Sequence, residues 1–318
     1  MRNHPRTQFL TLMLTGLLLA LPTGGATAEP APINDARVRE FRDLRFGMFV
    51  CWSFSTFSNV EWTHGVQQVN FFNPTGFDPD QWCEAAKDAG MKYILFLTKH
   101  HDGFCLWDTQ TTERKVTQSP LKVDALKKVR EACDRHGLKL ALYFSEGDWT
   151  WPDKKNADLK KAQLKELCTQ YGPIEYFWLD IAQTDGGLDL AATTQWIKQF
   201  QPNCFVGSNG NRPGADLHIG EMGAGFALDD AAKTKGYRAA EFTYPILGGR
   251  KEGRWFYTMP EWDSRVVPAA DIYQDYLAAI KSDSLFALDV APDRAGKIRD
   301  IDLKTLHEVG EMIRKPQP

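Results

Sequence analysis

The sequence predicts an α/β fold, a single-domain (β/α)8 barrel of the TIM type. Short apolar runs alternate with amphipathic segments about eight times, and this rhythm is typical of a parallel sheet. The 318 residues are enough for such a barrel, which needs roughly 250. Polar clusters directly follow several apolar runs, as they do at the mouth of a barrel. A doubly wound sheet is the alternative.

Aspartate and glycine mark the ends of the helices predicted in the first half. Asp78 begins a helix that Gly90 ends, and Gly137 ends a second helix over 123–136, since these residue types cap helices. An apolar or aromatic run follows each helix. The elements expected are helices over 36–42, 78–89, 123–136 and 156–170 and strands over 45–54, 91–98, 138–144 and 174–180.

The second half is less regular, because glycine and aspartate interrupt it up to about residue 236. The apolar pattern still indicates further strands and helices. With them the chain holds eight strand–helix units and no linker, which predicts one domain. The strands are expected over 204–207, 240–244, 254–257 and 284–290, and the helices over 191–200, 270–281 and 303–314.

The first 28 residues have the pattern of a secretory signal peptide. Arg2 and Arg6 precede an apolar run over 9–21, and Ala26-Thr-Ala28 supplies small residues for cleavage. The run is too short for a comfortable membrane span, and no later segment qualifies. We therefore expect a signal peptide over 1–28, a catalytic domain over 29–318, and export to the periplasm or the extracellular space.

Charge and cysteine usage narrow the function further. The formal net charge is −3, and removal of Arg2 and Arg6 with no acidic residue brings it to −5. A mildly acidic chain argues against nucleic-acid binding. The six cysteines lack the spacing of a zinc site. Several stand in apolar runs, so we expect mostly free, buried thiols.

Asp180 ends the strand over 174–180, where α/β barrels place their chemistry. Trp178, two residues earlier, shares its face. Unless Asp180 merely caps the next helix, a second acid would complete the carboxylate pair of a glycosidase. Glu241 has an apolar context that would raise its pKa, as a general acid requires, unless it is a solvated charge on a strand edge. The spacing leaves six partners open: Glu61, Glu146, Glu221, Glu241, Glu252 and Glu261.

His100 and His101 follow the strand over 91–98 and allow three roles. They could act as acid or base, donate hydrogen bonds to hydroxyl groups, or bind a metal with Asp102 and Asp148. In a strand the two rings would point to opposite faces, whereas in a turn both could reach one ligand. The metal site lacks a recognisable ligand spacing, and a serine hydrolase would need a G-x-S-x-G elbow that is missing.

Several segments, in order, resemble the α-L-fucosidases of glycoside hydrolase family 29 over about residues 40–315. The most specific runs from Lys99 to Trp107, Lys-His-His-Asp-Gly-Phe-Cys-Leu-Trp, and is close to K-H-H-[DE]-G-F-x-L-W. Trp178-Leu-Asp180 falls on the W-x-D that carries the nucleophile. The other matches are the opening R-F-G-[IM]-F-x-H-W strand at 45–52, the E-W pair at Glu61-Trp62, A-G-A-K-Y at 89–93, G-L-x-x-G-x-Y-x-S at 137–145 and N-x-L-L-N-x-x-P-x-x-x-G at 284–296.

The resemblance implies a barrel that removes terminal α-L-fucose from oligosaccharides or glycoconjugates with retention, through a covalent fucosyl–enzyme and without metal or organic cofactor. By position, Asp180 would be the nucleophile. Glu241 would be the acid/base, with Glu221 as second choice. The remaining matched positions would bind the sugar: His100, His101, Tyr143, Trp178 and Glu61 at its hydroxyls or ring, and Trp52 and Trp255 as an apolar wall near its methyl group.

Three departures from the family pattern bear on activity. Cys51 stands where the opening strand usually has His, and Ile181 replaces the usual Gly after the nucleophile. The accessory C-terminal β-sandwich is not expected in this chain. A lost buried hydrogen bond costs about 1–3 kcal/mol, enough to change sugar preference. A fucosidase-like carbohydrate-binding protein with weak or no turnover is therefore the alternative.

Overall fold

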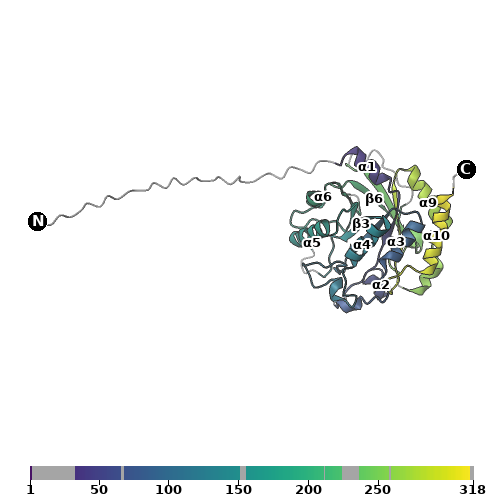
Figure 1. Cartoon of the computed structure of the whole chain (residues 1–318), viewed down its shortest axis with the longest axis horizontal. Coiled ribbons are helices and arrows are strands. Elements are labelled where there is room, and N and C mark those ends of the chain that lie inside the picture. The colour runs from purple at the N-terminus through teal and green to yellow at the C-terminus, as the bar shows by residue number, and fades with distance from the viewer. Residues whose placement is uncertain are drawn as a thin grey trace.

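Eight parallel strands close into a barrel, which confirms the predicted fold class (Figure 1). The computed structural model describes Met1 and residues 33–65, 68–150, 155–210, 212–223, 236–257 and 259–315. Neighbouring strands pair in chain order, and β1 pairs with β8 to close the sheet. The strands are β1 (Phe46–Val50), β2 (Tyr93–Lys99), β3 (Lys139–Ser145), β4 (Tyr176–Asp180), β5 (Phe205–Ser208), β6 (Leu217–Glu221), β7 (Ala239–Pro245) and β8 (Leu285–Asp289).

Helices surround the strands as an outer layer (Figure 1). Asp78 and Asp124 begin α3 and α4 by accepting hydrogen bonds from the backbone N–H groups of Gln81 (3.2 Å) and Lys127 (2.9 Å). Gly137 ends α4 at φ +69°, a conformation that glycine adopts without steric cost. The helices are α1 (Asp35–Arg42), α2 (Ser55–Ser58), α3 (Pro79–Asp88), α4 (Ala125–His136), α5 (Ala157–Gln170), α6 (Leu190–Phe200), α8 (Gly249–Glu252), α9 (Ala269–Lys281) and α10 (Asp300–Arg314), with 3₁₀ turns η1 (Val69–Phe71), η2 (Val116–Gln118) and η3 (Pro260–Arg265).

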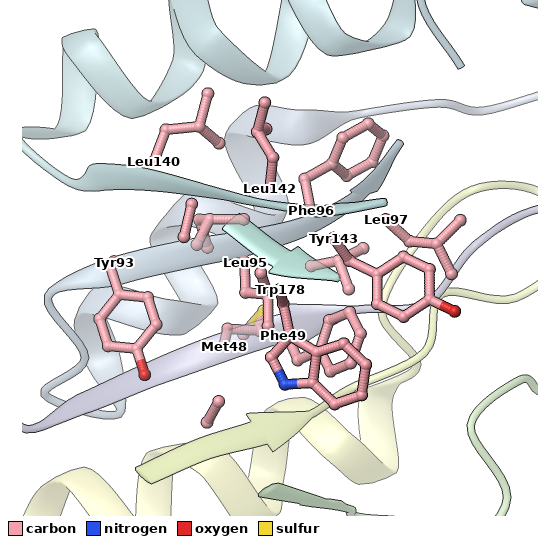
Figure 2. Close-up of a cluster of buried hydrophobic side chains, with 14 of the residues drawn as sticks. Met48, Phe49, Tyr93, Leu95, Phe96, Leu97, Leu140, Leu142, Tyr143 and Trp178 are labelled. Atoms are coloured by element: carbon pink, nitrogen blue, oxygen red, sulfur yellow. The ribbon is translucent and has the colours of Figure 1, made fainter. Parts of the chain in front are cut away.

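Alternation along the strands divides side chains between the helix layer and the barrel interior. Leu140 and Leu142 of β3 point towards the helices, whereas Tyr143 and Trp178 lie together on the other side of the sheet (Figure 2). On β4 the inward face that includes Trp178 also includes Asp180, two residues later. Because Asp180 is the last residue of β4, its carboxylate emerges at the C-terminal mouth.

Aromatic rings close the barrel interior below the mouth. The rings of Tyr93 and Tyr176 meet edge to face, with centroids 5.8 Å apart. Gly47 of β1 leaves room for them, since a Cβ there would lie 2.3 Å from the Tyr93 ring. At this level the interior is thus a packed core of side chains, as in other barrels of this type.

The prediction was wrong about the sixth strand. β6 spans Leu217–Glu221, inside the segment expected to be a loop, and 254–257 forms no strand. The alternation in β6 buries only two side chains, Leu217 and Ile219, which is too short a pattern to stand out from a glycine-rich context. Trp255 and Phe256 have high strand propensity, but their rings instead line a pocket.

The predicted signal peptide over 1–28 lies outside the described residues apart from Met1, so it stays a prediction. In the described part of the chain, no helix is long and apolar enough to cross a bilayer. All six cysteines are free and buried, as the sequence predicted.

Candidate active site

A pocket opens at the C-terminal mouth of the barrel, where barrel enzymes hold their ligands. The strand ends bring together side chains that lie far apart in the sequence. Six of the residues predicted to form the site line it: His100, His101, Tyr143, Trp178, Asp180 and Trp255. The rest of the lining is Phe49, Cys51, Trp62, Leu97, Glu221 and Phe256.

Three donors orient the Asp180 carboxylate in this pocket. Its Oδ2 accepts a hydrogen bond from Tyr143 Oη at 2.6 Å, and its Oδ1 accepts from the backbone N–H of Ile181 at 2.8 Å and from Asn209 Nδ2 at 3.1 Å. Burial and the nearby carboxylate raise the pKa of Tyr143 well above its usual value, so the phenol keeps its proton. A carboxylate held this way is pre-oriented for attack on a bound ligand.

Asn209 joins Asp180 to a second carboxylate. Its Nδ2 donates to Asp180 Oδ1 at 3.1 Å and to Glu221 Oε2 at 2.6 Å. These two oxygens are therefore separated by at most the sum of the two distances, about 5.7 Å. Retaining glycosidases hold their carboxyl groups about 5–5.5 Å apart, and inverting enzymes about 6.5–9.5 Å. The pair formed by Asp180 and Glu221 matches the shorter spacing.

Glu221 differs from Asp180 in its electrostatic surroundings. Partial burial of its carboxylate raises the pKa of Glu221, the negative charge of Asp180 raises it further, and the hydrogen bond from Asn209 lowers it. As the last residue of β6, Glu221 stands exposed at the rim. A carboxyl group that tends to keep its proton, beside one held by donors, is the usual assignment of acid and nucleophile.

His101 offers a hydrogen-bond acceptor to the pocket. The Ser145 hydroxyl donates to Gly147 O at 2.8 Å, so it must accept from His101 Nδ1 at 2.7 Å. Burial lowers the pKa of His101, although Asp180 opposes this, and the neutral ring then has its lone pair on Nε2. Nε2 lies 3.6 Å from Asp180 Oδ2. A ligand hydroxyl can therefore donate to His101 next to the carboxylate.

His100 lies in the same turn, directly after the last residue of β2. Its ring centroid is 4.1 Å from that of His101, and both rings line the pocket, as the prediction for a turn required. Burial lowers the pKa of His100 well below its usual value, and the neighbouring His101 lowers it further. Both histidines are thus suited to neutral hydrogen bonding with hydroxyl groups.

Aromatic rings form the walls of the pocket. Tyr143 and Trp178 stack at 5.3 Å, and Phe49 lies 5.8 Å from Trp255. The apolar C–H face of a sugar packs well on such rings. Trp52 was predicted to form part of this wall, but it does not line the pocket. It is fully buried behind the wall, where it stacks on Phe77 at 5.1 Å and its Nε1 donates to Asp293 O at 3.1 Å.

Glu61 holds one of these walls from outside the pocket. Its Oε1 accepts a hydrogen bond from the backbone N–H of Trp255 at 2.5 Å. Burial raises the pKa of Glu61 to about 7, against the lowering effect of the Trp255 bond. Glu61 is absent from the pocket lining, so it positions Trp255 and does not extend into the space where a ligand would lie.

The structure places Glu241 away from the pocket. It is the third residue of β7 and is fully buried inside the barrel, where it accepts a hydrogen bond from the hydroxyl of Tyr176. Burial raises the pKa of Glu241 to about 8, while Tyr176, Trp178 and Tyr93 lower it. The predicted apolar setting is therefore present, but a mid-strand position below the mouth keeps the carboxyl group from a ligand in the pocket.

This burial predicts a pH-dependent effect on stability. With a pKa of about 8 in the folded protein and 4.5 as its ordinary value, Glu241 favours folding below pH 4.5 relative to higher pH and lowers stability progressively up to about pH 8. Glu241→Gln, which is neutral throughout, should therefore gain about 2–4 kcal/mol relative to wild type between pH 5 and pH 8. Urea unfolding at both pH values measures the change. Glu84→Gln, on the exposed face of α3, is the control, and an equal Glu241→Gln effect at both pH values would contradict the assignment.

The metal site considered for the histidines finds no support in the described residues. Among them, no group of three or more His, Cys, Asp or Glu side chains is arranged to hold a metal ion. Asp102 Oδ1 accepts from the backbone N–H of Phe104 at 2.8 Å, and Asp148 Oδ1 accepts from Thr150. Both carboxylates thus shape the loops behind the pocket.

Two residues of the site gave weak signals in the sequence. Asn209 follows β5, at the kind of position where the mouth is built, but an amide between two acids has no spacing signature. Trp62, in the loop after α2, lines the pocket while remaining 53% exposed. An exposed indole can be recognised only in the fold, because aromatic residues in a sequence are usually core.

A closed (β/α)8 barrel with two carboxylates this close at its mouth defines a site of the glycoside-hydrolase class. Residues 26–316 match the family model described as alpha-L-fucosidase. The chain belongs to the alpha-L-fucosidase family, as the sequence motifs indicated.

Known relatives support this assignment. The chain is 29% identical to alpha-L-fucosidase 1 of Arabidopsis thaliana over 88% of its own length and 60% of that protein. It is 26% identical to the structure of alpha-L-fucosidase isoenzyme 1 from Paenibacillus thiaminolyticus, with a TM-score of 0.72 over 87% of this chain and 75% of that one. It is also 26% identical to the structure of a glycoside hydrolase 29 family member from an unknown rumen bacterium. That match has a TM-score of 0.74 and covers 90% of this chain and 58% of the other. The chain thus spans about three fifths of the plant relative.

Proposed function

We propose that this protein is a retaining exo-glycosidase that hydrolyses terminal α-L-fucose, with Asp180 as nucleophile and Glu221 as acid/base. The observation that carries the proposal is the single Asn209 amide bonded to both carboxylates, which limits their separation to about 5.7 Å. Family membership supplies the sugar. Glu221 takes the role that the motif comparison gave to Glu241, because Glu221 ends a strand and lines the pocket.

In the first step an Asp180 oxygen forms a bond to the anomeric carbon while the bond to the leaving oxygen breaks. Glu221 gives its proton to that oxygen, so the glycan leaves as a neutral alcohol. Tyr143 and Asn209 hold Asp180 in line during the attack. The product of this step is a covalent fucosyl–Asp180 ester and an ionised Glu221.

In the second step water replaces the aspartyl oxygen at the same carbon. The Glu221 carboxylate takes a proton from the water as it attacks, and Asp180 leaves as a carboxylate. Both residues return to their starting state. Two displacements at one carbon give net retention, and no cofactor takes part in the proton balance.

The test is the configuration of the first sugar released. Proton NMR of the wild-type reaction with an aryl α-L-fucoside distinguishes the two anomers before mutarotation mixes them. The expected first product is α-L-fucose. Initial release of the β anomer would overturn the retaining mechanism while leaving the fucosidase activity in place, and turnover only of other aryl glycosides would overturn the sugar assignment.

A binding protein without turnover is the second candidate, and two observations favour it. Cys51 lines the pocket as a neutral thiol, since burial and Asp289 raise its pKa well above the ordinary value. Ile181 adopts φ +47° directly after Asp180, a strained conformation for a β-branched residue. This candidate predicts fucose binding by calorimetry together with no release of nitrophenol, and Asp180-dependent release excludes it.

A further inference from the structure

The segment over 181–188 follows Asp180 directly and supplies one of the three donors to its carboxylate. Ile181 donates its backbone N–H to Asp180 Oδ1 at 2.8 Å while adopting φ +47°. This conformation is unfavourable for a β-branched residue and persists only where the surrounding structure holds it. Burial of the side chain contributes little, because Ile181 is 44% exposed. The contacts of the residues around Ile181 must therefore hold its backbone in place.

A buried ammonium group holds this segment. Lys160, on α5, is 4% exposed, and its Nζ donates to Leu188 O at 3.0 Å and to Gln183 O at 3.3 Å. It also pairs with Asp185 Oδ2 at 2.8 Å. The chain turns between Asp185 and Leu188, whose backbone groups bond each other. One cation thus fixes both sides of this turn and the residue before it.

Glu146 connects the same cation to the strand that carries Asp180. Its Oε2 accepts from Lys160 Nζ at 2.9 Å and from the backbone N–H of Gln183 at 3.1 Å. Its own backbone N–H donates to Asp180 O at 2.9 Å, and its carbonyl oxygen accepts from Gln183 Nε2 at 2.9 Å. The pair formed by Lys160 and Glu146 therefore holds the chain just before and just after Ile181.

Burial makes this arrangement depend on the charge of Lys160. The side chains of Glu146 and Asp185 are 0% and 2% exposed. Burial raises the pKa of Glu146, and Lys160 lowers it. Removing the ammonium would leave both acids buried without the cation that they share, which is strongly unfavourable, so the segment would shift to let water reach them. Lys160, Glu146 and Asp185 do not line the active-site pocket, so their influence on the reaction passes through Asp180.

We propose that Lys160 is a positioning residue for the nucleophile, because its buried ammonium fixes the segment over 181–188 and so keeps the Ile181 N–H on Asp180 Oδ1. This inference rests on the proposed function, since it assumes that Asp180 attacks the sugar. The expected consequence of losing the ammonium is a loss of turnover without a loss of binding. A misplacement of about 1 Å at the attacking group costs about 100-fold in rate, whereas His100 and His101 remain in place to bind the sugar.

The test is Lys160→Met, which keeps a long side chain and removes the charge. On an aryl α-L-fucoside, kcat should fall about 100-fold. The Kd for fucose, measured by calorimetry, should stay within about threefold of the wild-type value. A loss of fucose binding in parallel with kcat would show a general structural role and overturn the proposal.

Lys198→Met is the matched control. Lys198, on α6, is also a buried lysine, 8% exposed, which pairs with Asp216 at 2.8 Å and donates to Cys204 O at 3.1 Å. These partners directly precede β6 and β5, at the N-terminal end of the barrel. The control should therefore keep wild-type kcat, and an equal fall in kcat in both variants would contradict the positioning role.

A second variant covers the case in which Lys160→Met does not fold. Lys160→Met combined with Glu146→Gln and Asp185→Asn leaves no unpaired charge in the network, but it still lacks the ammonium that bonds Gln183 O and Leu188 O. It should show the same fall in kcat. Wild-type kcat in either folded variant would overturn the proposal.

Hydrogen exchange separates this inference from the proposed function. If the wild type shows no turnover, the proposed function fails. The backbone amides of Ile181, Gln183 and Leu188 should still exchange about tenfold faster in Lys160→Met than in the wild type, because the segment opens more often. In Lys198→Met they should exchange at the wild-type rate. Unchanged exchange in Lys160→Met would contradict the positioning role whatever the activity.

Discussion

Replacement of Asp180 by alanine is expected to lower kcat on an aryl α-L-fucoside by roughly 10,000-fold or more, the range seen when an attacking group is removed. The methyl group cannot form the ester, and Tyr143 and Asn209 lose the carboxylate that they orient. Release of nitrophenol measures the effect. The control is Asp158→Ala, on the exposed face of α5, which should keep wild-type activity.

Azide separates this loss from simple misfolding. In Asp180→Ala, azide fits the space left by the carboxylate and attacks the anomeric carbon directly, so activity should return with β-fucosyl azide as product. One displacement inverts the configuration. A folded Asp180→Ala variant with near wild-type kcat would show that Asp180 is not the nucleophile.

Replacement of Glu221 by alanine is expected to lower kcat/KM about 100- to 10,000-fold on a fucosylated oligosaccharide. The sugar alcohol is a poor leaving group that needs the proton, whereas nitrophenol leaves without it. The loss in the first step should therefore be much smaller on the aryl fucoside. Here azide should yield the α product, because it replaces water in the second displacement.

The matched control for Glu221 is Glu241→Gln, which keeps an acceptor for Tyr176 in the barrel interior. It should retain oligosaccharide turnover within a few-fold of wild type. The opposite pattern, with α-fucosyl azide from Glu241→Ala and normal kinetics in Glu221→Ala, would return the acid/base role to Glu241.

The barrel and the position of Asp180 could be predicted because each depends on local pattern. The strand predicted over 174–180 contains an uninterrupted apolar and aromatic run from Tyr176 to Leu179, and chemistry in a parallel barrel collects at the C-terminal ends of such strands. The same reasoning correctly grouped His100 with His101. Their joint access to the pocket depended on whether a turn began at residue 100, which the periodicity left open.

The acid/base could not be chosen from the sequence, because the choice depends on where a strand ends. Glu241 has the apolar neighbours that raise the pKa of a carboxyl group. These neighbours are apolar because Glu241 lies in the barrel interior, and not because it lies at the mouth. Glu221 ends β6, in which only two alternating side chains, Leu217 and Ile219, are buried. Such a short hydrophobic pattern does not predict a strand. The direction of the Trp52 side chain could not be predicted for a similar reason. A tryptophan that follows a strand can face either the mouth or the helix layer, and in this protein its packing against Phe77 determines the direction.

The bond from Trp255 to Glu61 connects residues 194 positions apart in the chain. Cys51 N–H donates to Asp289 across the seam where β1 meets β8, over 238 positions. Contacts this distant in sequence stabilise the fold only after a long loop has closed, which costs chain entropy. The pocket walls therefore come into register only when the last strand docks against the first, and a fragment that lacks either end has no complete binding site. Ligand binding by this protein would thus report on the whole barrel at once, so that a binding signal during refolding marks the final closure of the sheet.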